Sequence, residues 1–162
     1  MYEKLFRVRV GNQEYPLLYT LQASAEFDEH YVDIVEDVDY LRGSFSGPED
    51  ADGDTPEERK SKKKERQKAL IFFKSELPWL ISTLAKYGLK AAAKAGETNL
   101  PKPPTEQWIL DNAWPGQQAG MIMAFDKAYL YGRLLTHTEG ENKAVDVVLR
   151  ALEAKNGEGA AE

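Results

Sequence analysis

Three aspartates at alternate positions are the first residues whose types and spacing could do chemistry. Asp50, Asp52 and Asp54 match the opening of a calcium-binding loop, in which alternate side chains supply oxygen ligands. Such a loop then needs a glycine for its sharp turn and a glutamate at its last position. Thr55 and Ser61 stand at those two places. The segment is therefore expected to attract cations only weakly.

Two histidines and no cysteine leave few nitrogen or sulfur ligands for a transition metal. Asp33 follows His30 by three residues, but His137 is distant in the sequence, so ordinary partly buried histidines are expected. Glu26 and Glu76 could serve as general acid or base, although the sequence shows no partner for either. It also contains no glycine-rich phosphate loop and no nucleophile elbow. We expect a protein that is not an enzyme and holds no metal or cofactor.

The composition is that of a soluble globular chain. Among 162 residues, 42% are hydrophobic and 30% are charged, and the net charge of -6 argues against nucleic-acid binding by the whole surface. The absence of cysteine excludes disulfides and is compatible with a reducing cytosol. Apolar runs are too short to span a bilayer. These features predict an intracellular protein without a membrane partner.

A breaker cluster, an acidic run and a basic run follow one another in the first half of the chain. Residues 43 to about 66 contain few apolar side chains and are predicted to form a mobile, disordered charged insertion. Seven Lys or Arg residues lie within 59–68 and could contact phosphates. No aromatic residues interleave for base stacking, and the acidic run competes for the same charges. A solvated, self-neutralising arm is the preferred interpretation, and its basic part can extend the following helix.

The N-terminus has the pattern of a β-hairpin. Residues 5–10 alternate apolar and basic side chains, 11–14 have turn chemistry, and 15–21 can return as the second strand. Because a two-stranded hairpin is marginal alone, it needs a helix across one face. The segment 22–41 can form that helix, with an acidic outer surface.

A longer amphipathic helix follows the insertion. Its apolar residues recur at steps of three and four: Phe73, Leu77, Leu80, Leu84 and Tyr87. Pro78 leaves two alternatives, because either Ser75 caps a helix with Pro78 in its first turn, or one long helix kinks near Ser75. Gly88 or Gly96 is expected to end the helix. Trp79 is expected to be a buried core anchor.

The remaining elements complete an α+β, mainly helical fold, in which the N-terminal hairpin packs on a small helical domain. A short helix over 106–113 precedes a long helix that starts near Pro115. Residues 1–140 are predicted to form a single globular domain, and 141–162 a short amphipathic helix and a frayed tail. The apolar stripe of that last helix is either a core element or a docking surface for a partner. Its candidate partner-binding residues are Val145, Val148, Leu149 and Leu152.

The order of these parts resembles a known family. The hairpin of residues 6–18 is followed by a helix that begins near Gln22, a Leu-Pro-Trp-Leu-Ile-Ser-Thr-Leu helix at 77–84 and a Pro-Pro-Thr-Glu connector at 103–106. The final helix carries Ala119, Met121, Ala124, Gly132 and Arg133. This arrangement is similar to the tail assembly chaperones of siphophages and prophages, especially those of Gram-positive hosts. The resemblance covers most of residues 5–135 and finds no counterpart for the charged segment 43–68.

The resemblance implies a non-enzymatic protein that coats the tape-measure protein and keeps it soluble until tail-tube subunits arrive. It would act in the host cytoplasm during phage assembly and be absent from the mature virion. The tape-measure protein is then the main partner, tail-tube subunits are further candidates, and homo-oligomer formation stays open. Such proteins are also commonly made in a longer, frameshifted form. A slippery run could be encoded at Ala154-Lys155-Asn156, just before the tail.

Two other classes of function stay open. One is a structural virion protein, such as a connector or adaptor, which would be incorporated stably into particles. The other is a nucleic-acid accessory protein that uses the basic arm at 59–68, and its binding to DNA would collapse as salt is added.

Overall fold

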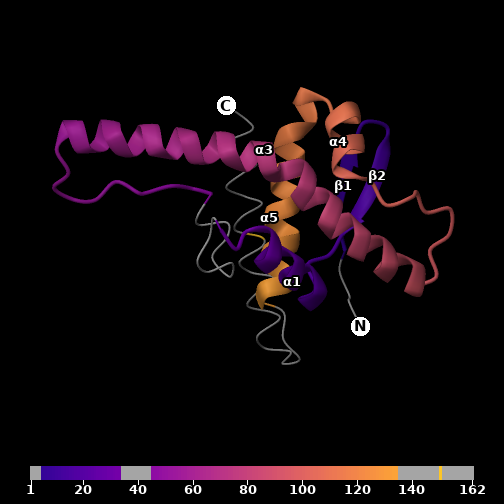
Figure 1. Cartoon of the computed structure of the whole chain (residues 1–162). Coiled ribbons are helices and arrows are strands. Elements are labelled where there is room, and N and C mark those ends of the chain that lie inside the picture. Colours follow the sequence, from indigo (N-terminus) through magenta and orange to yellow (C-terminus); the bar gives the residue numbers. More distant parts are fainter. Residues whose placement is uncertain (1–4, 34–44, 135–149, 151–162) are drawn as a thin grey trace.

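The computed structural model describes residues 5–33 and 45–134, together with Arg150. Along the chain, a β-hairpin is followed by helix α1, the very long helix α3, a short helix α4, a 3-10 turn η2 and helix α5 (Figure 1). This arrangement confirms the expected mainly helical α+β class with an N-terminal hairpin. Within the described ranges, no helix combines the length and apolar composition needed to cross a membrane.

The hairpin pairs β1 (Phe6–Val10) with β2 (Gln13–Leu17) in antiparallel register, Phe6 opposite Leu17 and Val10 opposite Gln13. The apolar residues of β1 are buried and its arginines exposed, as the alternation in the sequence predicts. Gly11 forms the turn with φ of +60°, a conformation that glycine adopts without strain. Its backbone is held by Gln117, whose amide both accepts from the Gly11 N–H at 2.8 Å and donates to the Gly11 carbonyl at 2.9 Å.

Helix α1 (Leu21–His30) begins where Thr20 caps it, since the Thr20 hydroxyl accepts from the Ala23 N–H. It buries Ala23 and Phe27. The helix predicted over 22–41 is therefore shorter in its described part, because residues 31–33 already form a turn. Residues 34–41 lie outside the described ranges.

Helix α3 (Pro56–Lys94) is continuous over 39 residues, which decides between the two alternatives for Pro78. Ser75 does not cap a helix; its hydroxyl donates to the Phe72 carbonyl within α3. The axis of α3 changes direction along its length (Figure 1), as expected where a proline removes one intrahelical hydrogen bond. Gly96, with φ of +91°, ends the helix in a Schellman arrangement of backbone bonds. Gly88 lies inside the helix.

The insertion differs from its prediction at both ends. Residues 56–66 belong to α3, so that half of the proposed disordered segment 43–66 is helical. Phe45 is only 2% exposed and lies against Phe72 and Phe73, with ring centroids at 5.4 and 5.1 Å. The sequence did not predict the burial of Phe45, because a single aromatic residue among polar neighbours gives no periodic signal. Whether residues 46–55 are mobile stays a prediction.

Helices α4 (Glu106–Asn112) and α5 (Gln118–Leu134) are joined by η2 (Pro115–Gln117). The core forms where the C-terminal half of α3, the hairpin and α5 meet. Its largest fully buried side chains are Tyr31, Phe27, Phe45, Phe73, Phe125, Leu17, Leu77, Leu80, Ile81, Leu84 and Ile109. Trp79 is not among them, because it is only partly buried and packs at the margin of the core. The expectation of a buried anchor at Trp79 was wrong.

Candidate functional site

A groove with a volume of about 680 Å³ lies between the start of α1 and the last turns of α3. Its lining is mostly apolar and is completed by two lysines: Leu5, Leu18, Thr20, Leu21, Gln22, Tyr87, Lys90, Ala91, Lys94 and Ala95. Leu21 is 88% exposed, although it is the first residue of a helix that packs on the core. Because Leu21 adjoins the other apolar lining residues, the groove presents continuous apolar surface, as protein-binding surfaces do.

The position of α1 along this groove is set by Glu26. Its carboxylate accepts hydrogen bonds from the Lys86 ammonium at 2.6 Å and from the Tyr87 hydroxyl. Burial alone would raise the pKa of Glu26, but these two hydrogen bonds outweigh it and lower the pKa below its usual value. The same contact, together with burial, raises the pKa of Tyr87 to about 12. A charged contact between α1 and α3 thus fixes the position of α1, which forms one wall of the groove.

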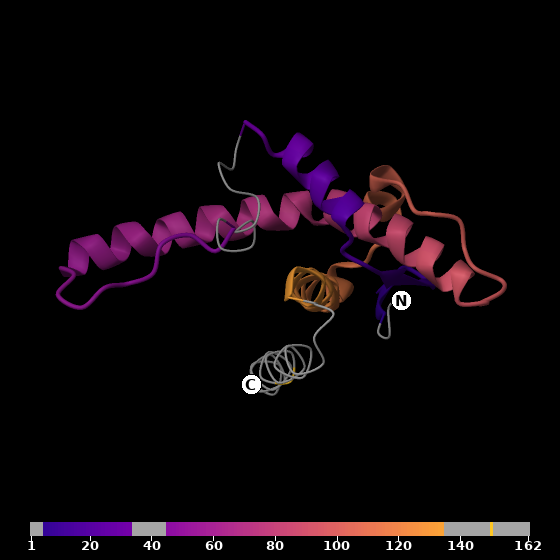
Figure 2. The ribbon, with the colours of Figure 1, turned by 90° about the horizontal axis from the view of Figure 1, so that it is seen from below.

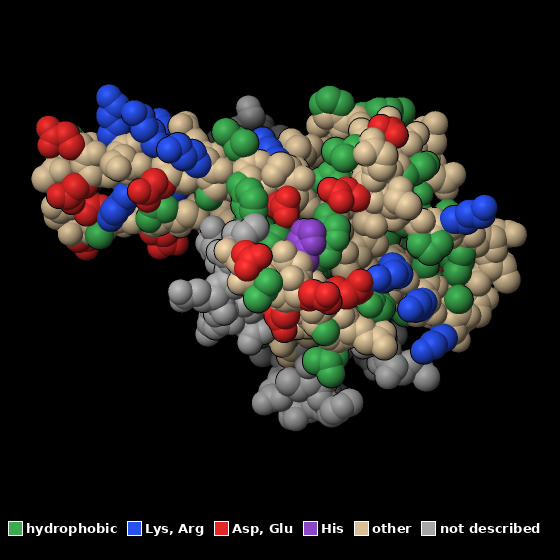
Figure 3. All heavy atoms as spheres, viewed as in Figure 1, with side chains coloured by type: hydrophobic (Ala, Val, Ile, Leu, Met, Phe, Trp, Pro, Cys, Tyr) green, Lys and Arg blue, Asp and Glu red, His purple; other side chains and the backbone are tan. Residues whose placement is uncertain are grey.

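The C-terminal half of α3 gives the groove a positive edge. Lys86, Lys90 and Lys94 recur every four residues, so they line one side of the helix. Figure 3 shows basic side chains gathered in a row over this half of α3 and acidic ones over α1. Lys86 forms an ion pair with Glu26, whereas Lys94 forms none with the described residues. The groove can therefore accept an apolar side chain next to a carboxylate.

A second cluster joins α1 to the middle of α3. The rings of His30 and Trp79 stack with centroids 3.7 Å apart, and His30 Nε2 lies 3.5 Å from Glu76 Oε1. Beside them, the buried Tyr31 hydroxyl has no hydrogen-bond partner among the described residues, and burial followed by the Glu76 charge raises its pKa. Sequence reasoning gave neither His30 nor Glu76 a partner, because their contact is made across two helices. Among the described residues, this cluster makes no contact with a candidate nucleophile. Its aromatic rings pack α1 onto α3.

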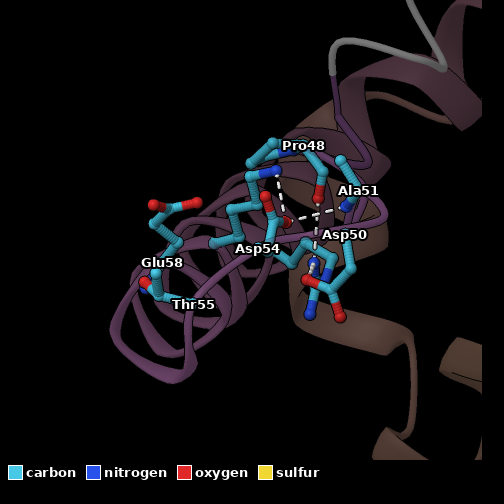
Figure 4. A network of polar contacts seen from close by, with 8 residues as sticks. Pro48, Asp50, Ala51, Asp54, Thr55 and Glu58 are labelled. Carbon is cyan, nitrogen blue, oxygen red and sulfur yellow. Dashed lines mark hydrogen bonds and ion pairs between the residues drawn. The ribbon is translucent and has the colours of Figure 1, made fainter.

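The third candidate is the arm, which we define as residues 46–71: the loop before α3 and the first turns of that helix. It projects away from the core in two perpendicular views (Figures 1 and 2). Figure 4 shows how the loop is fastened to the helix by ion pairs. Asp54 accepts from Lys62 Nζ at 2.7 Å, and Arg66 Nη1 donates to the Pro48 carbonyl and to Asp50, both at 3.0 Å.

These ion pairs also give a structural role to Asp50 and Asp54 of the acidic run. Asp54 forms an ion pair with Lys62 and Asp50 forms one with Arg66, so two of the three aspartates are engaged by basic side chains of α3. Elsewhere among the described residues, no group of three or more acidic or histidine side chains is arranged as a metal site requires.

The partner-binding residues predicted from the sequence, Val145, Val148, Leu149 and Leu152, lie outside the described residues, as does His137. The groove was missed by sequence reasoning because its walls come from three separate segments. A signal did exist: an apolar leucine directly after a Thr cap, and lysines at every fourth position of the long helix.

Comparisons of the chain with protein-family models, with curated proteins and with solved structures found no match.

Proposed function

We propose that this protein is a tail assembly chaperone of a siphophage or prophage. It binds the tape-measure protein in the host cytoplasm and keeps it soluble until the tail tube polymerises. The order of elements that carries the resemblance, from the hairpin to α5, is the first support for this proposal.

The observation that carries the proposal is the open apolar groove beside α1. A chaperone for a long helical client must bind apolar stripes reversibly, and a groove that takes one face of an amphipathic helix does this without enclosing the client. Leu21 supplies exposed apolar surface at the rim, while Lys90 and Lys94 favour clients with acidic residues beside the stripe.

The test is co-expression of this chain with the tape-measure protein encoded by the same phage. We expect the tape-measure protein to be largely insoluble alone and mainly soluble with the chaperone. The Leu21→Glu variant should lose most of that effect, because it places a carboxylate in the apolar rim. Leu110→Glu is the matched control: Leu110 is 55% exposed on α4, away from the groove, and its variant should act like the wild type.

Failure of the wild-type chain to increase tape-measure solubility would contradict the proposal. Stable incorporation of the chain into purified phage particles would contradict it as well, and would favour a connector or adaptor.

A further inference from the structure

The outer surface of the arm carries a stripe of lysines that form no ion pair within the described part of the chain. Lys60, Lys64 and Lys68 recur every four residues of α3 and are exposed, and Arg59 and Lys63 form the adjacent row. None of the five forms an ion pair with the described residues. Exposed Ile71 continues the stripe toward the core at 69% exposure. We call Lys60, Lys64, Lys68 and Ile71 the basic stripe.

The ion pairs of the arm explain why this stripe stays charged. The acidic loop lies along the opposite side of α3, where it uses Lys62 and Arg66. The interpretation of a wholly self-neutralising arm is therefore incomplete, since the charges are separated onto two sides of one helix. Lysines four residues apart repel each other within a helix, so binding of an external anion would stabilise the helix that carries the stripe.

An acidic surface of similar extent lies on α1 and the turn after it. Asp28, Glu29 and Asp33 are exposed and form no ion pair with the described residues. Val32 beside them is 68% exposed, so apolar surface adjoins the acidic charges just as Ile71 adjoins the basic ones. Figure 3 shows acidic side chains gathered over α1 and basic ones along one edge of the arm. We call Asp28, Glu29, Val32 and Asp33 the acidic face.

We propose that the basic stripe of one copy docks on the acidic face of a second copy of this chain. The tip of the arm points away from the hairpin, α1, α4 and α5 (Figures 1 and 2). Each copy has one stripe and one face at different places, so the contact is head-to-tail and can repeat along a row of copies. This inference is independent of the proposed chaperone function.

The charge balance favours a second copy over a nucleic acid as the occupant. The chain has 27 acidic and 21 basic residues, so a long polyanion that followed the stripe toward the core would meet a surface of its own sign. The acidic face offers carboxylates together with an exposed apolar residue, which matches the composition of the stripe.

The experiment is sedimentation velocity of the full chain at low salt and at about 1 M salt, where the Debye length is about 3 Å. We expect a mass above one chain at low salt and the monomer at high salt. The Lys60→Glu/Lys64→Glu variant should be monomeric at low salt, with an unchanged circular dichroism spectrum. Arg9→Glu/Lys102→Glu makes the same change in net charge away from the arm and the groove, and this control should associate like the wild type.

A charge swap provides the decisive measurement. The Glu29→Lys/Asp33→Lys variant should also be monomeric, because its stripe and face are both basic. When it is mixed with Lys60→Glu/Lys64→Glu, opposite charges face each other again, and association should return. A wild-type chain that is monomeric at low salt, or association that survives the arm reversal, would overturn the proposal. Binding of duplex DNA by a monomeric chain, lost on arm reversal, would instead assign the stripe to nucleic acid.

Discussion

The backbone of Pro16 crosses Gly88 so closely that α3 has no room there for any side chain. A Cβ at Gly88 would overlap the Pro16 carbonyl and would lie 2.9 Å from the Leu17 backbone nitrogen. Just beyond, the Leu18 N–H donates to the Leu84 carbonyl of α3 at 3.1 Å. On the other side of the same segment, a Cβ at Gly132 of α5 would overlap Tyr19 in a similar way. Two glycines thus let α3 and α5 approach the backbone closely at the end of β2 and in the connection to α1.

We expect the Gly88→Ala substitution to destabilise the protein by about 3 kcal/mol or more, because neither backbone can move without disturbing the hairpin. This loss exceeds the gain of about 1 kcal/mol that alanine normally brings to a helix interior. Urea unfolding followed by circular dichroism measures the difference. Gly120 in α5 is the control: it has no atom within 4 Å of its Cβ position, so Gly120→Ala should be neutral or stabilising.

The second prediction concerns Gln117, which fastens the tip of the hairpin to η2. Its amide makes the two bonds to Gly11 and also accepts from the Trp114 N–H at 3.1 Å. Gln117→Ala should lower the free energy of unfolding by about 2 kcal/mol, since it leaves partly buried backbone groups unpaired. Gln107→Ala is a suitable control, because the side chain of Gln107 donates to Asp111 in its own helix and to no other described residue. Equal losses in the two variants would contradict the role assigned to Gln117.

The third prediction is a loss of stability in alkali. The pKa of Tyr87 is raised to about 12, so the folded state keeps this proton between pH 10 and pH 12 while the unfolded state releases it. Stability contributed by Tyr87 is therefore present below pH 10 and is lost as the pH rises through this range. Stability measured from pH 9 to pH 12 should fall less steeply in Tyr87→Phe than in the wild type.

The same contact predicts the opposite dependence in acid. The pKa of Glu26 is lowered, so its contribution is present above the usual carboxyl range and is lost as the pH falls through the lowered pKa. Glu26→Gln should be less stable than the wild type at neutral pH, and the difference should shrink in acid. A constant difference between the two proteins down to pH 2 would contradict the charged contact.

The fifth prediction tests the ion pairs of the arm with trypsin, which is expected to cleave first between Arg59 and Lys68. The Asp50→Asn/Asp54→Asn variant should be cut there several-fold faster, because the loop is no longer held against α3 and local opening becomes easier. Asp52 belongs to the same acidic run but has no partner among the described residues, so Asp52→Asn should be cut at the wild-type rate. Initial rates resolved by mass spectrometry distinguish these outcomes.

Local patterns in the sequence predicted the hairpin, because apolar and basic residues alternate in β1, and they predicted the short helix α4. They also showed the apolar stripe of α3 from Phe73 to Tyr87. These features depend on neighbours within a few residues, and periodicity records such neighbours directly. Pro78 was ambiguous on the same evidence, because a proline is compatible both with a first turn and with a kinked helix interior.

Only the tertiary structure decided the features that depend on residues far apart in the chain. Phe45 is buried because Phe72, Phe73 and Tyr31 surround it, whereas Trp79 lies at the margin of the core and stacks on His30, which is itself exposed. The groove forms where α1 leaves the hairpin beside α3, and the unpaired basic stripe exists because the acidic loop folds onto the other side of the helix. Burial and charge pairing depend on which residues are neighbours in space. Those neighbours are brought together by folding, so patterns among residues close in the sequence do not reveal them.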